Sequence, residues 1–180
     1  MNRYALFTDV SLNPVLKLGF GAYLVIPSSF LKMPPERIIR PEFIEKIKLR
    51  RFDDTSSAKL EVQTILWALE DFQKEATGSG FGTLDVYSDS QCVTGLQRRR
   101  AHLEMNGFYS GGTNRLLKNA CLYRKFFEFH DALGFEVIKV VGHSRSCSHD
   151  SIHRIFSFVD KEARKALKLC MKEFPGRATT

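Results

Sequence analysis

The chain has 180 residues, a formal net charge of +7, 43% apolar residues and 15 phenylalanines. This length and apolar content predict one folded domain over residues 1–180, with a loose tail from about residue 174, and no apolar run approaches a membrane span. The first residues lack the apolar stretch of a signal peptide, and the cysteines are scattered without a C-x-x-C pair. We therefore expect a cytoplasmic protein with reduced thiols, no membrane contact and no obligate protein partner.

Strand patterns dominate the beginning of the chain. Apolar residues predict a first strand over Tyr4–Asp9, a second over Gly19–Ile26 that pairs with it as a hairpin, and a third within Phe43–Phe52. Prolines interrupt the stretch between the second and third strands, so we expect a loop or extension over about residues 30–42. Whether residues 27–52 carry a partner site stays open.

Helices and strands alternate in the rest of the chain. Capping residues before Ala58 and a helical apolar period predict a helix over residues 58–76. The later elements are a strand over 84–87, a helix capped by Ser90, a helix over 115–133, a strand over 135–141 and a helix over 152–173. This order predicts an α/β fold with a five-stranded mixed sheet, in which three antiparallel strands precede parallel strands and helices flank the sheet.

Four acidic residues occupy positions where they can meet. Asp9 ends the first strand and Asp89 follows the fourth, and a right-handed crossover through the helix 58–76 would lay these strands side by side. Glu61 lies in the first turn of that helix, on one stripe with apolar Ile65. Asp160 lies on the face of the last helix that the apolar pattern predicts to be buried.

Each acid alone has an ordinary explanation, as a turn residue, a helix-start charge or a partly exposed flank. Four carboxylates gathered together would repel one another unless cations shared them. Two Mg²⁺ or Mn²⁺ ions about 4 Å apart would meet this need, and would activate a water and stabilise the leaving oxygen of a phosphodiester.

Basic residues are concentrated between Arg98 and Lys125, where seven lysines and arginines accompany one acid, Glu104. Such a segment favours an acidic polymer, and nucleic acid in particular, as a partner. A solvated basic helix face is the alternative.

Four short motifs, taken together, resemble the ribonuclease H family of type 1-like proteins. They occur in the family's order, on matching elements, across nearly the whole chain. The motifs are Phe7-Thr8-Asp9-Val10-Ser11, Ser56-Ser57-Ala58-Lys59-Leu60-Glu61, Tyr87-Ser88-Asp89-Ser90-Gln91, and Val140-Val141-Gly142-His143-Ser144 followed by Val159-Asp160-Lys161-Glu162-Ala163. The resemblance implies a ribonuclease H-like fold and an endonuclease that hydrolyses the RNA strand of RNA–DNA hybrids with two Mg²⁺ ions.

The same resemblance implies roles for individual residues. It makes Asp9, Glu61, Asp89 and Asp160 the catalytic metal ligands. It also implies that His143 is a loop histidine that assists proton transfer or product release, a role for which His149 and His153 compete. The residues implied to contact nucleic acid are Ser11, Asn13, Ser57, Gln91, Arg98, Arg99 and Arg100.

The chain departs from the family at Val10, where a glycine is usual, and at Ala58, where an asparagine often reads the RNA minor groove. These departures leave the substrate preference open. One alternative is a nuclease of the same fold that acts on DNA, similar to resolvases or transposases, and another is a non-catalytic nucleic-acid-binding module. A proofreading exonuclease is disfavoured because no glutamate follows Asp9 by two residues.

Overall fold

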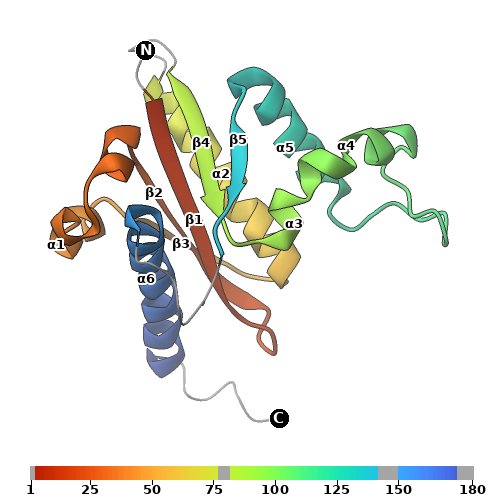
Figure 1. Cartoon of the computed structure of the whole chain (residues 1–180). Coiled ribbons are helices and arrows are strands. Elements are labelled where there is room, and N and C mark those ends of the chain that lie inside the picture. Colours follow the sequence, from red (N-terminus) through yellow and green to blue (C-terminus); the bar gives the residue numbers. More distant parts are fainter. Residues whose placement is uncertain (1–2, 77–81, 142–149, 174–180) are drawn as a thin grey trace.

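The computed structural model describes residues 3–76, 82–141 and 150–173, and within them five strands form one sheet in the order β3-β2-β1-β4-β5 (Figure 1). The strands are β1 (Arg3–Asn13), β2 (Leu18–Pro27), β3 (Lys48–Phe52), β4 (Thr83–Ser88) and β5 (Glu136–Lys139). β2 is antiparallel to both β1 and β3, whereas β4 is parallel to β1 and β5 is parallel to β4. The predicted five-stranded mixed sheet is therefore confirmed.

Helices cover both faces of this sheet (Figure 1). The longer helices are α2 (Ser57–Ala76), α4 (Leu96–Met105), α5 (Ala120–Leu133) and α6 (Ser151–Glu173), and the short ones are α1 (Arg40–Ile44) and α3 (Gln91–Thr94). None of the helices in the described ranges is long and apolar enough to cross a bilayer.

Two separate cores lie on the two faces of β1, because successive side chains of a strand point in opposite directions. Leu6 belongs to the core formed with α2 and α5. Ala5 and Phe7 belong to the other core, formed with α1 and α6. β1, the central strand of the sheet, is thus buried on both sides.

Three predicted boundaries differ from the structure. β1 extends beyond Asp9 because its antiparallel pairing with β2 continues to Asn13 opposite Leu18. The helix predicted to begin at Arg115 begins at Ala120, since an isolated bridge joins Tyr109 to Leu116. The expected loop before β3 contains α1 and two 3-10 turns, η1 (Ser28–Lys32) and η2 (Pro35–Arg37).

Two glycines allow α2 to lie close to β2. A Cβ atom on Gly19 would stand 2.4 Å from Leu60 Cδ2, and one on Gly21 would stand 2.1 Å from Thr64 Oγ1. Side chains at these two positions would force the helix away from the sheet. The glycines therefore set the position of the first turns of α2.

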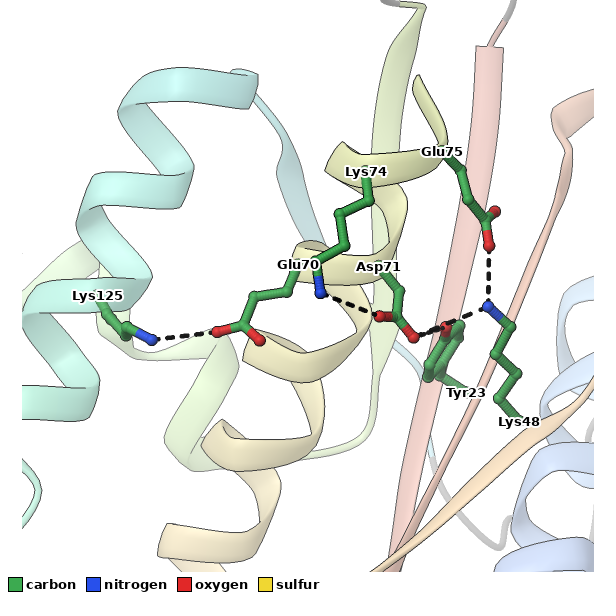
Figure 2. Close-up of polar contacts among 7 residues, drawn as sticks. All are labelled: Tyr23, Lys48, Glu70, Asp71, Lys74, Glu75 and Lys125. Carbon is green, nitrogen blue, oxygen red and sulfur yellow. Dashed lines mark hydrogen bonds and ion pairs between the residues drawn. The ribbon is translucent and has the colours of Figure 1, made fainter. Parts of the chain in front are cut away.

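Polar contacts fix the far end of α2 to its neighbours (Figure 2). Lys125 Nζ on α5 lies 3.1 Å from Glu70 Oε1. Tyr23 OH on β2 donates a hydrogen bond to Asp71 Oδ2 at 2.7 Å, and Lys48 Nζ on β3 donates one to Glu75 Oε1 at 2.9 Å. The helix is held on both flanks, by α5 on one side and by the sheet on the other.

Candidate active site

The parallel pairing of β1 with β4 determines how Asp9 and Asp89 lie relative to each other. The parallel ladder pairs Arg3 with Thr83 and ends with Phe7 opposite Tyr87, whose rings stack at 4.8 Å between centroids. The same offset, continued by two residues, brings Asp89 level with Asp9. Since side chains alternate along a strand, Asp9 shares the face of Phe7, on which α6 packs.

Asp160 reaches this place from α6, which packs on β1 and β2. Its side chain is 16% exposed, and its Oδ1 lies 2.6 Å from Arg164 Nε one turn further along the helix. The arginine compensates part of the charge of a largely buried carboxylate. Sequence reasoning placed Asp160 on this face but missed Arg164, although its i+4 spacing from an acid was the available signal.

The electrostatics of Asp9 show that the three aspartates interact. Burial, then the negative charge of Asp89, and then Asp160 raise the pKa of Asp9 to about 8, against an opposing hydrogen bond from the Val10 backbone N–H. A carboxylate with two like neighbours in a partly buried place favours either a proton or a cation. The guanidinium of Arg164 balances only part of this negative charge.

Glu61 lies beside the turn that follows β4 and is held by two serines. Ser57 Oγ donates a hydrogen bond to Glu61 Oε1 at 3.0 Å, and Ser90 Oγ donates one to Oε2 at 2.5 Å. Ser90 Oγ also accepts a hydrogen bond from the Val93 N–H, so the predicted helix cap is confirmed. The bond from Ser90 to Glu61 joins the first turn of α2 to the residue next to Asp89, and sequence reasoning missed it.

The donor set is four carboxylates, the oxygen ligands that hard divalent ions prefer. Among the described residues, no three His, Cys, Asp or Glu side chains already surround one point as a finished metal site. Asp160 is directed to Arg164 and Glu61 to its serines, whereas Asp9 interacts with both other aspartates. The chemistry of these residues fits a divalent ion, and rotation of the carboxylates would be needed to hold it.

The predicted loop histidine, His143, lies outside the described residues, and so does His149. His153 lies in the first turn of α6, where its N–H and its Nδ1 lie 2.8 and 2.7 Å from Asp150 Oδ1. His153 therefore takes part in the beginning of α6 rather than in a loop.

The four polar residues predicted to contact nucleic acid, Ser11, Asn13, Ser57 and Gln91, differ in their surroundings. Asn13 Oδ1 accepts hydrogen bonds from the N–H groups of Val15 and Leu16, and Asn13 Nδ2 lies 3.2 Å from Met171 Sδ. Ser57 bonds Glu61, as described above, while Ser11 is half-buried on β1. Gln91 is exposed at the start of α3.

The three predicted arginines of α4 have different surroundings. Arg100 lies 2.5 and 2.8 Å from the two carboxylate oxygens of Asp131, and so ties α4 to α5. Arg99 donates to the backbone carbonyls of Gly95 and Cys92 at 3.2 Å. Arg98 is exposed and has no polar partner within the described ranges. Arg98 is consequently the arginine of this group that is best placed to meet a ligand.

No protein-family model matches the chain, and no curated protein matches it in sequence. Among solved structures, the foamy viral protease-reverse transcriptase in complex with dsDNA is similar to it, with a TM-score of 0.58 at 10% identity, over 91% of this chain and 94% of that chain. At this identity the likeness concerns the fold. Together with the sheet order and the crossover through α2, it defines an α/β protein with the ribonuclease H-like fold.

Proposed function

We propose that this chain is a metal-dependent endonuclease that hydrolyses the RNA strand of RNA–DNA hybrids. The observation that carries the proposal is the gathering of Asp9 on β1, Asp89 just after β4 and Asp160 on α6, where the two neighbours contribute to the raised pKa of Asp9. Repulsion among neighbouring carboxylates lowers the stability of a fold. Such a group is common at catalytic sites, where bound metal ions would offset the repulsion.

The proposed ligands of two Mg²⁺ ions, or of Mn²⁺, are Asp9, Glu61, Asp89 and Asp160. Bound ions would supply the Lewis acidity that activates an attacking water and stabilises the leaving oxygen. The chain's own contribution is to position the carboxylates, through Ser57 and Ser90 at Glu61 and through Arg164 at Asp160. His143 is proposed to assist proton transfer or product release.

Nucleic acid as the substrate is supported by two observations. The similar solved structure holds dsDNA, and the chain carries a net charge of +7 with an exposed Arg98 on α4 that has no polar partner among the described residues. The preference for a hybrid rests on the resemblance of the motifs. The products of such a reaction carry 5′-phosphate and 3′-hydroxyl ends.

A cleavage assay tests this proposal. RNA–DNA hybrid, duplex DNA and duplex RNA are incubated with the protein in Mg²⁺, in Mn²⁺ and in EDTA. We expect cleavage of the RNA strand of the hybrid, dependent on the metal and abolished by Asp89→Asn. Asp150→Asn is the matched control, because Asp150 is an aspartate that caps α6 and lies outside the acid group. Cleavage of duplex DNA alone would replace the hybrid by DNA as substrate, and unchanged cleavage by Asp89→Asn would overturn the site.

A further inference from the structure

The outward face of α6 carries a row of basic side chains, of which the proposed active site uses only Arg164, the partner of Asp160. Successive helical residues are about 100° apart, so the five positions fall within roughly 100° of the helix circumference, opposite its buried side. We call this row the α6 stripe, and all of its members are exposed. They are Lys161, Arg164, Lys165, Lys168 and Lys172.

The α6 stripe lacks the compensating acids of an ordinary solvated helix. Between Lys161 and Lys172 the sole acid is Glu162, which is buried and bound to Arg40 Nη2 at 2.7 Å. The four lysines form no hydrogen bond or ion pair with any residue that the structure describes.

Helix stability does not account for this arrangement. Like charges at i and i+4, as in Lys161–Lys165 and Lys168–Lys172, destabilise a helix. The helix dipole favours cations only in the last turn, which covers Lys172 but not Lys161. The charge is therefore better matched to an anionic partner than to the helix itself.

The position of the stripe relates it to the acid group. It begins at the residue after Asp160 and ends beside Met171, which contacts Asn13 at the end of β1. α6 and β1 thus lie alongside each other from the aspartates to the hairpin (Figure 1). At 1.5 Å per residue the stripe is about 16 Å long, which is roughly the rise of five base pairs of a duplex.

We propose that the α6 stripe binds the phosphodiester backbone of the nucleic-acid duplex that flanks the cleaved position. This inference rests on the proposed function and adds a second contact to it, on α6 rather than on α4. Regularly spaced lysines on a helix suit repeated phosphates, and such contacts carry no base specificity. Only a duplex long enough to extend past the acids reaches the stripe.

The experiment measures binding rather than cleavage. Lys165→Gln, Lys168→Gln and Lys172→Gln are combined in an Asp89→Asn background in EDTA, and the affinity for a labelled hybrid of about 20 base pairs is followed against salt concentration. Lys32→Gln, Arg37→Gln and Lys46→Gln form the matched control, since these residues are exposed on the segment between β2 and β3 and the loss of charge is equal. Circular dichroism and thermal unfolding verify that both variants fold.

We expect the stripe variant to reduce the salt slope by about 2.7, since each lost phosphate contact removes about 0.9. When the salt concentration rises from about 50 to 200 mM, the affinity of the parent should therefore fall about 40-fold more than the affinity of the stripe variant. A hybrid of about 8 base pairs should bind both proteins alike, and the control should keep the parent's slope.

The inference is overturned by an unchanged slope in the stripe variant, by an equal loss in the control, or by the same loss with the short hybrid. Loss of binding to anionic phospholipid vesicles with hybrid binding intact would also overturn it, in favour of a membrane. If the wild-type protein cleaves no substrate while the stripe still governs hybrid binding, the nuclease proposal fails and the binding surface stands.

Discussion

Ser90 Oγ lies 2.5 Å from Glu61 Oε2, so a single hydroxyl links the crossover helix α2 to the turn after β4. The same oxygen accepts from the Val93 N–H and caps α3. One side chain thus orients a candidate metal ligand and completes the helix that follows Asp89.

We predict that Ser90→Ala lowers the free energy of unfolding by about 1–2 kcal/mol, because the cap of α3 and a bond to a carboxylate are lost together. Cleavage of the hybrid should fall as well, since Glu61 loses one of its two partners. Ser57→Ala removes only the more exposed of the two bonds to Glu61 and should cost less stability. Urea unfolding compares the two, and an equal effect of both substitutions contradicts this role of Ser90.

Asp89→Asn should stabilise the metal-free protein while it removes activity. It relieves the repulsion that contributes to the raised pKa of Asp9. In EDTA the variant is expected to unfold at a higher temperature than the wild type, by a few degrees. Mg²⁺ should raise the unfolding temperature of the wild type more than that of the variant, since ligand binding stabilises only the state that binds it. Equal responses to Mg²⁺ would count against Asp89 as a ligand.

Gly21→Ala should destabilise the fold by about 1–3 kcal/mol, because the added methyl would overlap fully buried Thr64. The displacement of α2 would also move Glu61, so hybrid cleavage should decrease with stability. Gly111→Ala is the control, since no atom lies within 4 Å of a Cβ at that position. Chemical denaturation of both variants measures the difference, and equal stabilities would show that α2 can retreat without cost.

Tyr23 makes stability fall at alkaline pH. Burial above all, with Asp71 acting in the same direction and Lys48 against it, raises the pKa of Tyr23 to about 12 from the model-peptide value of 10.0 (Figure 2). The folded state therefore holds its phenolic proton more tightly than the unfolded state. The resulting stabilisation is complete below about pH 10 and is lost as pH rises towards 12, by an amount on the order of 2 kcal/mol.

Tyr23→Phe should flatten this part of the stability curve, although it lowers stability at neutral pH by removing the hydrogen bond to Asp71. Unfolding free energies of the two proteins between pH 9 and about 12 give the comparison. A parallel decline in both would place the alkaline transition elsewhere.

Arg98 and Arg100 should separate into a binding and a structural role. Arg100→Gln is expected to lower the unfolding temperature by a few degrees, since it removes the contact with Asp131 that joins α4 to α5 and the contact with Glu104 within α4. Arg98→Gln should leave stability unchanged and reduce the salt slope of hybrid binding by about 0.9. The opposite pattern, with Arg98 affecting stability, would contradict the contacts described.

Much of the fold follows from local patterns that survive in three dimensions. The apolar period of α2 and α6 and the alternation in β1, β2 and β4 depend on burial in the core on one or the other face of the sheet, so the sequence alone predicts them. The packing of residues 28–47 does not follow in this way. Ile38 and Phe43 are buried there in the core that contains α6. The sequence of this segment does not show which of its apolar residues will be buried, because that depends on α6.

The candidate site was predictable in its acids but only partly in their partners. The crossover rule brings Asp9 and Asp89 together, since topology decides which strand ends meet. Ser90 meets Glu61 from another element of the fold, which no spacing rule supplies, whereas the i+4 spacing of Arg164 from Asp160 was an available signal for their contact. Arg100 was predicted to contact nucleic acid, but in the structure it is bonded to Asp131 on α5.

Because β1 is buried on both sides, the alternation of its side chains also decides on which face of the sheet Asp9 lies. Leu6 and Phe7 are assigned to opposite cores, so loss of a single residue between Phe7 and Asp9 would rotate the carboxylate to the α2 side while the apolar residues before it stayed in place. Point substitutions in this strand adjust the acid group, whereas a one-residue deletion would dismantle it. Insertions and deletions in natural variants of this chain should accordingly spare the segment from Ala5 to Asp9.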